Sequence, residues 1–500
     1  MCQRINFIFK RNINSKTLLV SNLKQQILEL QSVSAALEPN EKQRNLYIQE
    51  VSKYANTFIN GLEDAKAFSS VEPTPNAMAL SKEKKSLSDI LKLYADEVEA
   101  KGIKPASGGH IGYIPGGGIY TSAIADYIAD VTNEYSGMHF ASPGAVAMEN
   151  ELLDWMKSMF GFPKIAIGNL TSGGSIANLI ALTAARDKHQ IKNNKIENSV
   201  IYVSDQVHHC INKALRIIGL EDVIIRHVEL DDYSRIIPED LSAKTENDKA
   251  AGLNPFLVIA SSGTTDTGAI DPLQTIGEIA IDNNLWYHID AAYGGFFILT
   301  ESKKDAFKGI ELADSLVIDP HKGLFLPYGL GAVLVKDKDS VYHSHHYRAN
   351  YMQDAIGDSM PVNPADVSPE LTKHFRGLRL WLPLQLHGIE PFVACLEEKL
   401  LLIRYFRERL LEIGFKLGPE PDLSVSYFWY PSKSIDENAF NEKLMEEIHN
   451  DGEIFLSSTI INDKFVIRMA ILSFRTKLET IEKAVSMIGK ARKTVESNLT

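Results

Sequence analysis

Short β-branched runs that alternate with helical stretches, from about residue 105 to 385, constrain the fold of this chain more than any other feature. The runs lie at 201–203, 257–260, 286–289, 316–318 and 332–335. Apolar runs this short, separated by segments with helical periodicity, predict βαβ units and a mostly parallel sheet covered by helices on both faces. Ligands of such α/β sheets bind beyond the carboxyl ends of the strands. Functional residues are therefore expected directly after these runs.

Two smaller parts flank this predicted large domain. Apolar residues at helical spacing predict helix over 22–66, and the Pro-containing stretch 71–80 is typical of a linker. We therefore expect residues 1–104 to form a helical arm and linker, which packs either on a partner subunit or on its own. The last part alternates too, with strands expected at 425–429 and 465–468 and helices at about 387–412, 436–450 and 477–495. The predicted division is thus 1–104, a large ligand-binding α/β domain at 105–385, and a small α+β domain at 386–500.

Composition narrows the classes of partner. The 52 basic and 64 acidic residues give a net charge of -12, which argues against a nucleic-acid or anionic-membrane partner. No apolar run approaches the length of a membrane span. Three cysteines are too few for a disulfide framework or a zinc cluster, so no metal site is expected, and they fit a reducing, cytoplasmic environment. Residues 1–20 carry four basic residues and no acid, a faint similarity to an organelle presequence, but a disordered start is favoured.

The first candidate site follows the run 286–289. A carboxylate at the end of a buried strand, such as Asp290, is costly unless a cation or hydrogen bonds meet it. The protonated ring nitrogen of pyridoxal phosphate (PLP) is such a partner, because the ring withdraws electrons best in that state. Ala292, two residues on, points to the same side and is small enough for a flat ring to lie against it. Taken alone, this pattern is more commonly a helix cap.

The second candidate site follows the run 316–318. Lys322 comes 322−290 = 32 residues after Asp290, which leaves room for one crossover helix and the next strand. A lysine at a strand end is usually a solvated charge. Near a cationic or desolvating site, however, its pKa falls and it can attack an aldehyde as a free amine. His321 either hydrogen-bonds a cofactor phosphate or caps the turn.

The third candidate site is the glycine-rich segment 171–179, which opens a helix. Glycines such as Gly174 allow close backbone approach, and amides exposed at a helix N-terminus attract a phosphate. Ser175 adds a hydroxyl donor, whereas Ser172 is explained equally well as an N-cap. The order of phosphate loop, Asp290 and Lys322 along the chain makes the set specific.

Two further candidates follow the remaining strands. His208 comes after the run 201–203, where an imidazole either stacks on a cofactor ring and faces a substrate carboxylate or is only structural. Thr265 comes after the run 257–260 and either offers a hydroxyl to the cofactor or belongs to a tight turn. Two adjacent histidines at a predicted ligand-binding edge favour the functional interpretation of His208.

Together these segments resemble the group II PLP-dependent decarboxylases, the family of aromatic-L-amino-acid, tyrosine, histidine and glutamate decarboxylases. The resemblance covers about residues 38–490 and rests on the segments 171–179, 204–208, 262–265, 288–293, 319–322 and 375–381. Segments 141–145 and 351–354 look most similar to the bacterial aromatic-amino-acid decarboxylase-like branch.

The resemblance implies fold-type I PLP architecture and a homodimer with active sites at the subunit interface. It implies that Lys322 forms the Schiff base with PLP, that Asp290 pairs with the ring nitrogen, and that Ala292 and His208 lie below and above the ring. Other positions match cofactor contacts at the phosphate or through a hydroxyl: Gly174, Ser175, His321 and Thr265.

The substrate side of the site is implied less directly. Tyr113 matches a tyrosine of the family's substrate pocket, and Ile114 is a neighbouring pocket position. Arg468 stands where the family keeps an arginine in the small domain, and it either anchors a carboxylate or forms a structural ion pair.

Two departures from the aromatic branch bear on the product and the substrate. The stretch 363–370 lacks the tyrosine that, in that branch, protonates the carbanion left after CO2 departs, although Tyr347 and Tyr351 precede it. Relatives without that tyrosine can divert the intermediate to O2 and release an aldehyde. The pocket positions that are aromatic in the aromatic-acid enzymes are Pro105, Gly109, Ile114 and Gly137 here, which leaves the recognised side chain open.

The resemblance favours α-decarboxylation of an L-amino acid to the amine and CO2, most simply on an aromatic-type substrate. One alternative is an aldehyde synthase that consumes oxygen. Another is a catalytically silent PLP-fold protein that serves as a binding partner, although the retained Lys322, Asp290 and His208 argue against it.

Overall fold

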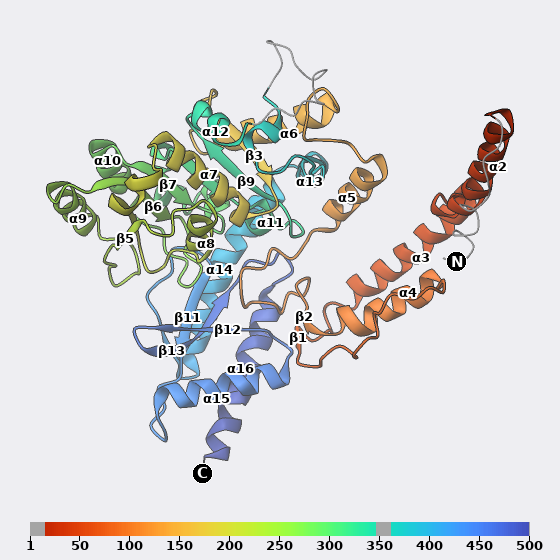
Figure 1. The fold of residues 1–500 in the computed structure, drawn as a ribbon. Coiled ribbons are helices and arrows are strands. Elements are labelled where there is room, and N and C mark those ends of the chain that lie inside the picture. The colour runs from red at the N-terminus through yellow and green to blue at the C-terminus, as the bar shows by residue number, and fades with distance from the viewer. Residues whose placement is uncertain (1–15, 347–361, 500) are drawn as a thin grey trace. The chain divides into compact units, whose positions relative to one another are not determined.

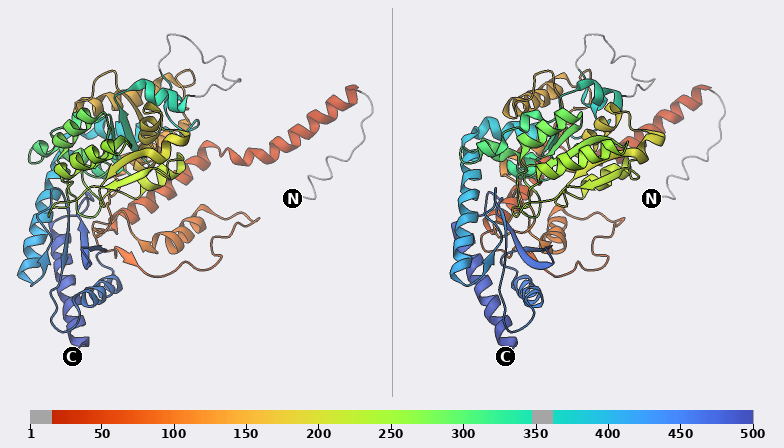
Figure 2. Two further views of the ribbon diagram at one scale, coloured as in Figure 1. Left: turned by 60° about the vertical axis from the view of Figure 1, so that its left-hand side comes forward. Right: turned by 90° about the vertical axis from the view of Figure 1, so that its left-hand side faces the viewer.

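The computed structural model of the protein describes residues 16–346 and 362–499. Contacts divide the chain into two compact units, one comprising Met1–Asp64 and Pro73–Ala100, the other Ala65–Glu72 and Lys101–Thr500. Figures 1 and 2 show the elements of both units from three directions. The finer division into three domains stays a prediction.

The first unit is helical. It contains α2 (Lys16–Ser34), α3 (Glu41–Asn60) and α4 (Leu87–Tyr94), and a π-helical turn at Ala95–Glu99 continues α4. The segment 22–66 is therefore two helices rather than one. A 3₁₀ turn at Ala35–Leu37 separates them, and Asn40 begins α3 by accepting a hydrogen bond from the Gln43 amide at 3.0 Å. None of the residues of α3 is buried in the described part of the chain.

A seven-stranded sheet forms the centre of the second unit. Its order is β3-β9-β8-β7-β6-β4-β5. The strands are β3 (Ile167–Thr171), β4 (Ser199–Val203), β5 (Ile224–His227), β6 (Asn254–Ser261), β7 (Trp286–Asp290), β8 (Ser315–Ile318) and β9 (Gly331–Val335). Neighbouring pairs from β5 to β8 are parallel, whereas β9 runs antiparallel to both β8 and β3. The five predicted runs are all strands of this mostly parallel sheet, and β3 and β5 extend it beyond the prediction.

Helices cover both faces of this sheet, as Figure 1 shows. The helices of this part of the chain are α5 (Tyr120–Thr132), α6 (Pro143–Met159), α7 (Gly174–Lys188), α8 (Cys210–Ile217), α9 (Pro238–Ala250), α10 (Leu273–Asn283), α11 (Pro320–Gly323), α12 (Lys338–His345) and α13 (Gly377–His387). Successive residues of a strand point to opposite faces, and β6 follows this rule. Val258 and Ala260 pack into one core, and Leu257 and Ile259 into the other, which includes residues of α7 and α8.

The C-terminal residues form a second, antiparallel sheet in the order β10-β11-β13-β12. The strands are β10 (Lys416–Leu417), β11 (Val425–Trp429), β12 (Ser457–Ile461) and β13 (Lys464–Ala470), with helices α14 (Glu390–Glu412), α15 (Glu437–Asp451) and α16 (Leu478–Asn498). A separate core that includes Phe406, Phe428 and Phe440 holds these elements together. A short antiparallel pair, β1 (Phe68–Ser69) and β2 (Gly102–Ile103), completes the unit.

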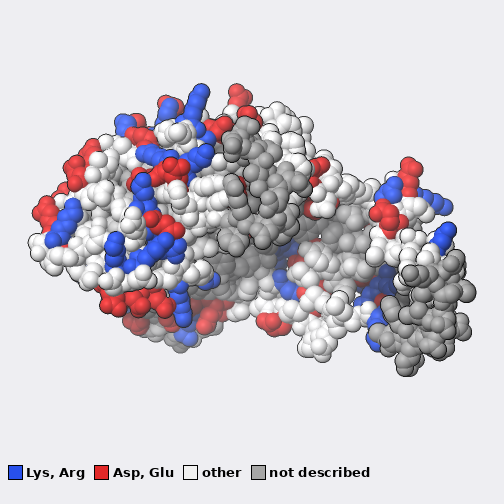
Figure 3. All heavy atoms as spheres, turned by 45° about the horizontal axis from the view of Figure 1, so that its top comes forward, with Lys and Arg blue, Asp and Glu red and all other residues white. Residues whose placement is uncertain are grey.

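The surface is mixed in charge on the face that Figure 3 shows, where Lys and Arg lie interspersed with Asp and Glu. None of the helices in the described ranges is both long and apolar enough to cross a membrane.

Candidate active site

A cavity of about 350 Å³ opens beyond the carboxyl ends of β6, β7 and β8, beside the N-terminus of α7. That volume lies within the range of small-molecule sites, roughly 300–1,000 Å³. Eight of the residues predicted from the sequence line it: Gly174, Ser175, His208, Thr265, Asp290, Ala292, His321 and Lys322. Other lining residues were not predicted, among them Asn178, Gln206, Asp319 and Tyr328.

Asp290 ends β7 with both carboxylate oxygens hydrogen-bonded. Oδ2 accepts from Asn178 Nδ2 at 3.1 Å, and Oδ1 accepts from the backbone N–H of Ala292 at 3.0 Å. The side chain is only 8% exposed. Two donors meet the cost of burying this carboxylate, and its position is therefore fixed by the protein itself.

Lys322 lies in the short helix α11, one turn after Asp319. Its Nζ is 3.0 Å from Asp319 Oδ2. Burial lowers the pKa of Lys322, but the carboxylates of Asp319 and Asp290 raise it by more, and the net shift is upward. The sequence predicted a lowered pKa only beside a cationic or desolvating site, whereas the charges nearest to Lys322 are carboxylates. The reason is that the capping residue of α11 is an acid that faces the amine.

The start of α7 is a candidate anion site. The φ of Gly173 is +150°, in a region that favours glycine. A Cβ on Gly174 would lie 3.3 Å from the Ala292 Cβ and 3.1 Å from Asp319 Oδ2. The glycines thus let the first amides of α7 approach the cavity closely, where they can bind a phosphate.

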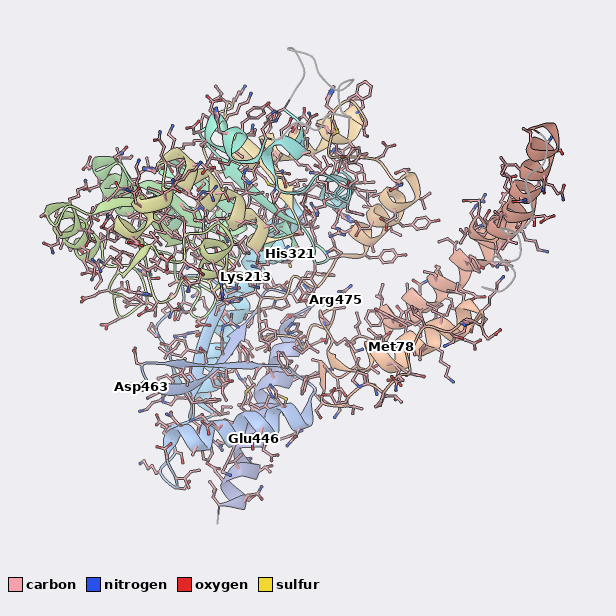
Figure 4. The ribbon with its side chains drawn as sticks, viewed as in Figure 1. Met78, Lys213, His321, Glu446, Asp463 and Arg475 are labelled. Atoms are coloured by element: carbon pink, nitrogen blue, oxygen red, sulfur yellow. The ribbon has the colours of Figure 1, made fainter. Side chains whose placement is uncertain are left out.

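His321 borders this anion site and is labelled in Figure 4. Its Nδ1 lies 2.6 Å from the carbonyl oxygen of Leu330, so Nδ1 carries a hydrogen and donates it. Burial lowers the pKa of His321. The ring is therefore held in one orientation by Leu330, the residue before β9, and its Nε2 lies 3.8 Å from Asp319 Oδ2.

His208 lies just before α8, next to His209, with the two ring centres 4.1 Å apart. Its Nδ1 accepts a hydrogen bond from the Cys210 amide at 3.3 Å. Burial lowers the pKa of His208, which favours the neutral ring. A neutral ring whose Nδ1 accepts a hydrogen bond carries its hydrogen on Nε2, and His208 lines the cavity.

Three predicted substrate residues, Tyr113, Ile114 and Arg468, do not line the cavity that the described residues form. Arg468 on β13 is buried and donates to the main-chain oxygens of Thr265, at 2.9 Å from Nε, and of Tyr113, at 3.2 Å from Nη1. The Tyr113 ring is 58% exposed and packs against Phe455. Arg468 thus fixes the loop that carries Thr265. These contacts are not an ion pair, and a contact between Arg468 and a substrate carboxylate stays a prediction.

The stretch 363–370 is anchored to the body of the unit. Residues Pro364–Val367 form a 3₁₀ turn, and Asn169 Nδ2 donates to the Pro364 carbonyl at 3.0 Å. Arg376 holds Glu370 through two hydrogen bonds, at 2.7 and 2.8 Å. Tyr347 and Tyr351 lie outside the described residues.

The four non-aromatic positions also lie away from the cavity lining. A Cβ on Gly109 would come within 2.8 Å of the Glu453 oxygen, and one on Gly137 within 2.5 Å of the Leu371 oxygen. Both glycines are therefore required for close backbone packing.

The residues present fit PLP. A lysine amine, a buried carboxylate held by two donors, a small residue at Ala292 and a helix N-terminus with glycines meet in one cavity. The lysine amine matches the aldehyde of the cofactor, and the carboxylate matches its ring nitrogen. Ala292 matches the face of the ring, and the helix N-terminus matches the phosphate. No cluster of residues able to hold a metal ion occurs among the described residues. The mostly parallel sheet and this set of residues define a PLP-dependent enzyme of the fold-type I class.

Comparisons with known proteins identify the family. Residues 76–430 match the pyridoxal-dependent decarboxylase conserved domain. The chain is 35% identical over 375 residues to the aromatic-L-amino-acid decarboxylase of Bacillus atrophaeus, covering 74% of this chain and 78% of that protein. It is 28% identical over 468 residues to the phenylacetaldehyde synthase of Arabidopsis thaliana, covering 89% and 94%. The crystal structure of Oryza sativa TDC with PLP and tryptamine has a TM-score of 0.86 at 22% identity, covering 91% of this chain and 99% of that one.

The chain belongs to the pyridoxal-dependent decarboxylase family. It is a PLP-dependent carboxy-lyase that acts on an amino acid, as the sequence predicted.

Proposed function

We propose that the cavity at the ends of β6, β7 and β8 decarboxylates an aromatic-type L-amino acid to its amine, with Lys322 as the residue that holds PLP covalently. The convergence of Lys322, Asp290 and the start of α7 on one cavity supports this assignment. Bound PLP supplies the sink for the electron pair left when CO2 departs. Asp290 holds the proton on the ring nitrogen, Ala292 supports the ring, and Gly174, Ser175 and His321 bind the phosphate.

The remaining groups orient the substrate. His208 presents its Nε2–H on the cavity side, where it stacks over the ring and directs the substrate carboxylate. Thr265 contributes a hydroxyl, and Arg468 keeps its loop in place through the main-chain hydrogen bond. In the assembled enzyme, Tyr113 and Ile114 contact the substrate.

Covalent trapping tests the lysine. Lys322→Ala should abolish turnover, and borohydride should fix PLP to the native protein but not to this variant. Lys213→Ala serves as the matched control, because Lys213 lies exposed on α8 and is labelled in Figure 4. Equal fixation in native protein and Lys322→Ala would refute the assignment.

The second candidate function is an aldehyde synthase. The observation that favours it is the sequence of the anchored stretch 363–370, which contains no tyrosine. The purified enzyme should be incubated with a panel of L-amino acids while CO2, amine, aldehyde and O2 are recorded together. Amine formed in the same amount as CO2 supports the decarboxylase, whereas O2 uptake with aldehyde and ammonia supports the synthase. A catalytically silent protein would give none of these products.

We also infer a homodimer with active sites at the interface. Along α5, large apolar side chains recur on one exposed face: Tyr120, Ile124, Tyr127, Ile128 and Val131. The arm helices expose apolar residues too, among them Leu23 and Ile27 on α2. Exposed apolar helix faces of this kind favour a protein partner. Sedimentation should give twice the chain mass, and Ile124→Asp should shift it toward one chain mass. The cysteine content fits a cytoplasmic location, which cell fractionation would test.

A further inference from the structure

A chain of hydrogen bonds leads from the cavity into the sheet behind Asp290. Trp286, His288 and Asp290 alternate along β7 and so share one face of the sheet. Trp286 Nε1 and His288 Nδ1 each lie 2.8 Å from Ser315 Oγ on the neighbouring strand β8. His288 Nε2 lies 2.7 Å from Asn178 Oδ1, and Asn178 Nδ2 lies 3.1 Å from Asp290 Oδ2. The chain thus connects β7, β8 and α7.

The direction of each hydrogen bond follows from the two ends. The Trp286 indole only donates, and the ionised carboxylate of Asp290 only accepts. Asn178 must therefore turn its NH2 group toward Asp290, and its oxygen accepts from His288 Nε2–H. Burial lowers the pKa of His288 to about 4, so the ring is neutral at pH 7 and Nδ1 is an acceptor. The Ser315 hydroxyl then donates to Nδ1 while its oxygen accepts the indole N–H.

We propose that the chain Trp286–Ser315–His288–Asn178 orients and polarises the Asp290 carboxylate, and so sets how strongly Asp290 holds the cofactor ring nitrogen. This inference rests on the proposed pairing of Asp290 with that nitrogen. The four side chains that these hydrogen bonds link are all buried. In buried surroundings, hydrogen bonds aligned head to tail strengthen one another. His288, Ser315 and Trp286 do not line the cavity and are positioning residues.

A series of variants in the holoenzyme tests the proposal. His288→Leu removes the N–H that Asn178 accepts, and should raise the dissociation constant of PLP about tenfold. It should also shift the absorbance of the bound cofactor in the same direction as Asp290→Asn, by a smaller amount. His288→Gln places an amide N–H near the original Nε2 and should restore both properties to within about threefold of wild type. The effect should decrease from His288→Leu to Ser315→Ala to Trp286→Phe.

A matched control separates this effect from a loss of packing. Ser262→Ala also removes a fully buried hydroxyl at a strand end, but Ser262 Oγ has no partner in the described residues. It should leave the cofactor spectrum and the PLP dissociation constant unchanged. A spectral shift in Ser262→Ala equal to that in Ser315→Ala would overturn the proposal.

The tautomer of His288 in the wild-type holoenzyme gives a second test. In holoenzyme labelled with ¹⁵N at histidine, the His288 signal, assigned by its loss in His288→Gln, should be that of a neutral ring with the proton on Nε2. A proton on Nδ1, or a charged ring at neutral pH, would overturn the proposal. The proposal would also be overturned if His288→Leu kept the wild-type absorbance of the bound cofactor while Asp290→Asn shifted it. An unshifted spectrum in Asp290→Asn would instead overturn the pairing of Asp290 itself, and with it the inference.

Discussion

Two carboxylates at the ends of neighbouring strands border the same cavity, and their surroundings differ. Asp290, at the end of β7, accepts from Asn178 and from the Ala292 backbone, one donor for each oxygen. Asp319, directly after β8, pairs through Oδ2 with Lys322, while its buried Oδ1 has no partner among the described residues. Asp290 is thus held by protein groups that the proposed chemistry does not modify. Asp319 depends on the lysine that the proposed chemistry modifies.

The comparison shows which of the two carboxylates the protein itself holds in a fixed position. A buried charge is tolerated when hydrogen bonds satisfy it, and a group left half-satisfied is costly. The sheet therefore presents Asp290 as a fixed acceptor. Asp319 keeps part of its hydrogen-bonding capacity open, next to the amides at the start of α7.

Removing the fixed carboxylate should have the largest effect. Asp290→Ala should lower kcat/KM by about 10²–10³-fold, because the ring nitrogen loses the group that stabilises its charge in the transition state. Steady-state kinetics with saturating PLP measures the change, and Asp319→Ala is the comparison, with a smaller loss expected. Equal losses would remove the distinction between the two acids.

The second-largest effect should be a loss of folding stability in acid, because the folded protein buries neutral histidines. Burial lowers the pKa of both His288 and His110 to about 4. The pKa of a histidine in the unfolded chain is about 6.5. Above that pH the protein keeps its full free energy of unfolding. As the pH falls toward 4, each of the two histidines lowers that free energy by on the order of 3 kcal/mol, because only the unfolded chain takes up the proton. His110→Phe should therefore lose less stability than wild type between those pH values. Chemical denaturation at both ends of the range measures the difference, and identical acid sensitivity would contradict it.

Two buried serine hydroxyls at strand ends allow the same comparison, between a hydrogen-bonded group and one without a partner, for groups that carry no charge. Ser315 and Ser262 are both fully buried, but only Ser315 Oγ is hydrogen-bonded in the described structure. Ser315→Ala should cost about 1–3 kcal/mol of unfolding free energy, because it leaves Trp286 Nε1 and His288 Nδ1 without a partner. Ser262→Ala should stay within about 0.5 kcal/mol of wild type. Denaturant titration of both variants decides the point, and the reverse order would exclude this account.

The smallest effect should appear at the partly satisfied acid. Among the charges near Lys322, Asp319 raises its pKa most, so Asp319→Asn should lower that pKa and leave more free amine at neutral pH. The apoenzyme should then bind PLP covalently several-fold faster, as followed by the cofactor absorbance after mixing. Retention of the wild-type rate and pH dependence would show that Asp319 does not control the amine.

The large sheet was predictable because most of its strands are buried on both faces and therefore read as continuous apolar runs. β3 escaped prediction because Gly168 and Asn169 interrupt it. The structure explains them, since Asn169 bonds the Pro364 carbonyl, and a Cβ on Gly168 would come within 2.8 Å of Leu153. The antiparallel direction of β9 leaves no trace in hydrophobic periodicity, which is the same for either direction.

The cofactor side of the site was predictable for a related reason. Strand ends and a glycine-rich helix start place its residues at one edge of the sheet. His288 and Asn178 were missed as interacting residues, yet a signal existed. His288 stands at the middle of β7 between the apolar residues Tyr287 and Ile289, and Asn178 stands on the buried face of α7 beside Ala177 and Ala181. The hydrogen bonds of Arg468 were not predictable, because they are to main-chain oxygens, which the sequence does not mark.

The hydrogen bonds behind Asp290 also have a consequence for folding. His288 lies opposite Ser315 in the pairing of β7 with β8. A slip of one residue would bring Leu316 opposite His288 and leave the imidazole, the indole and the amide without partners in the core. Apolar strands alone distinguish poorly between such alignments, since either alignment buries hydrocarbon. The polar groups therefore make misaligned sheets unstable, and the chain can fold into this site in one register only.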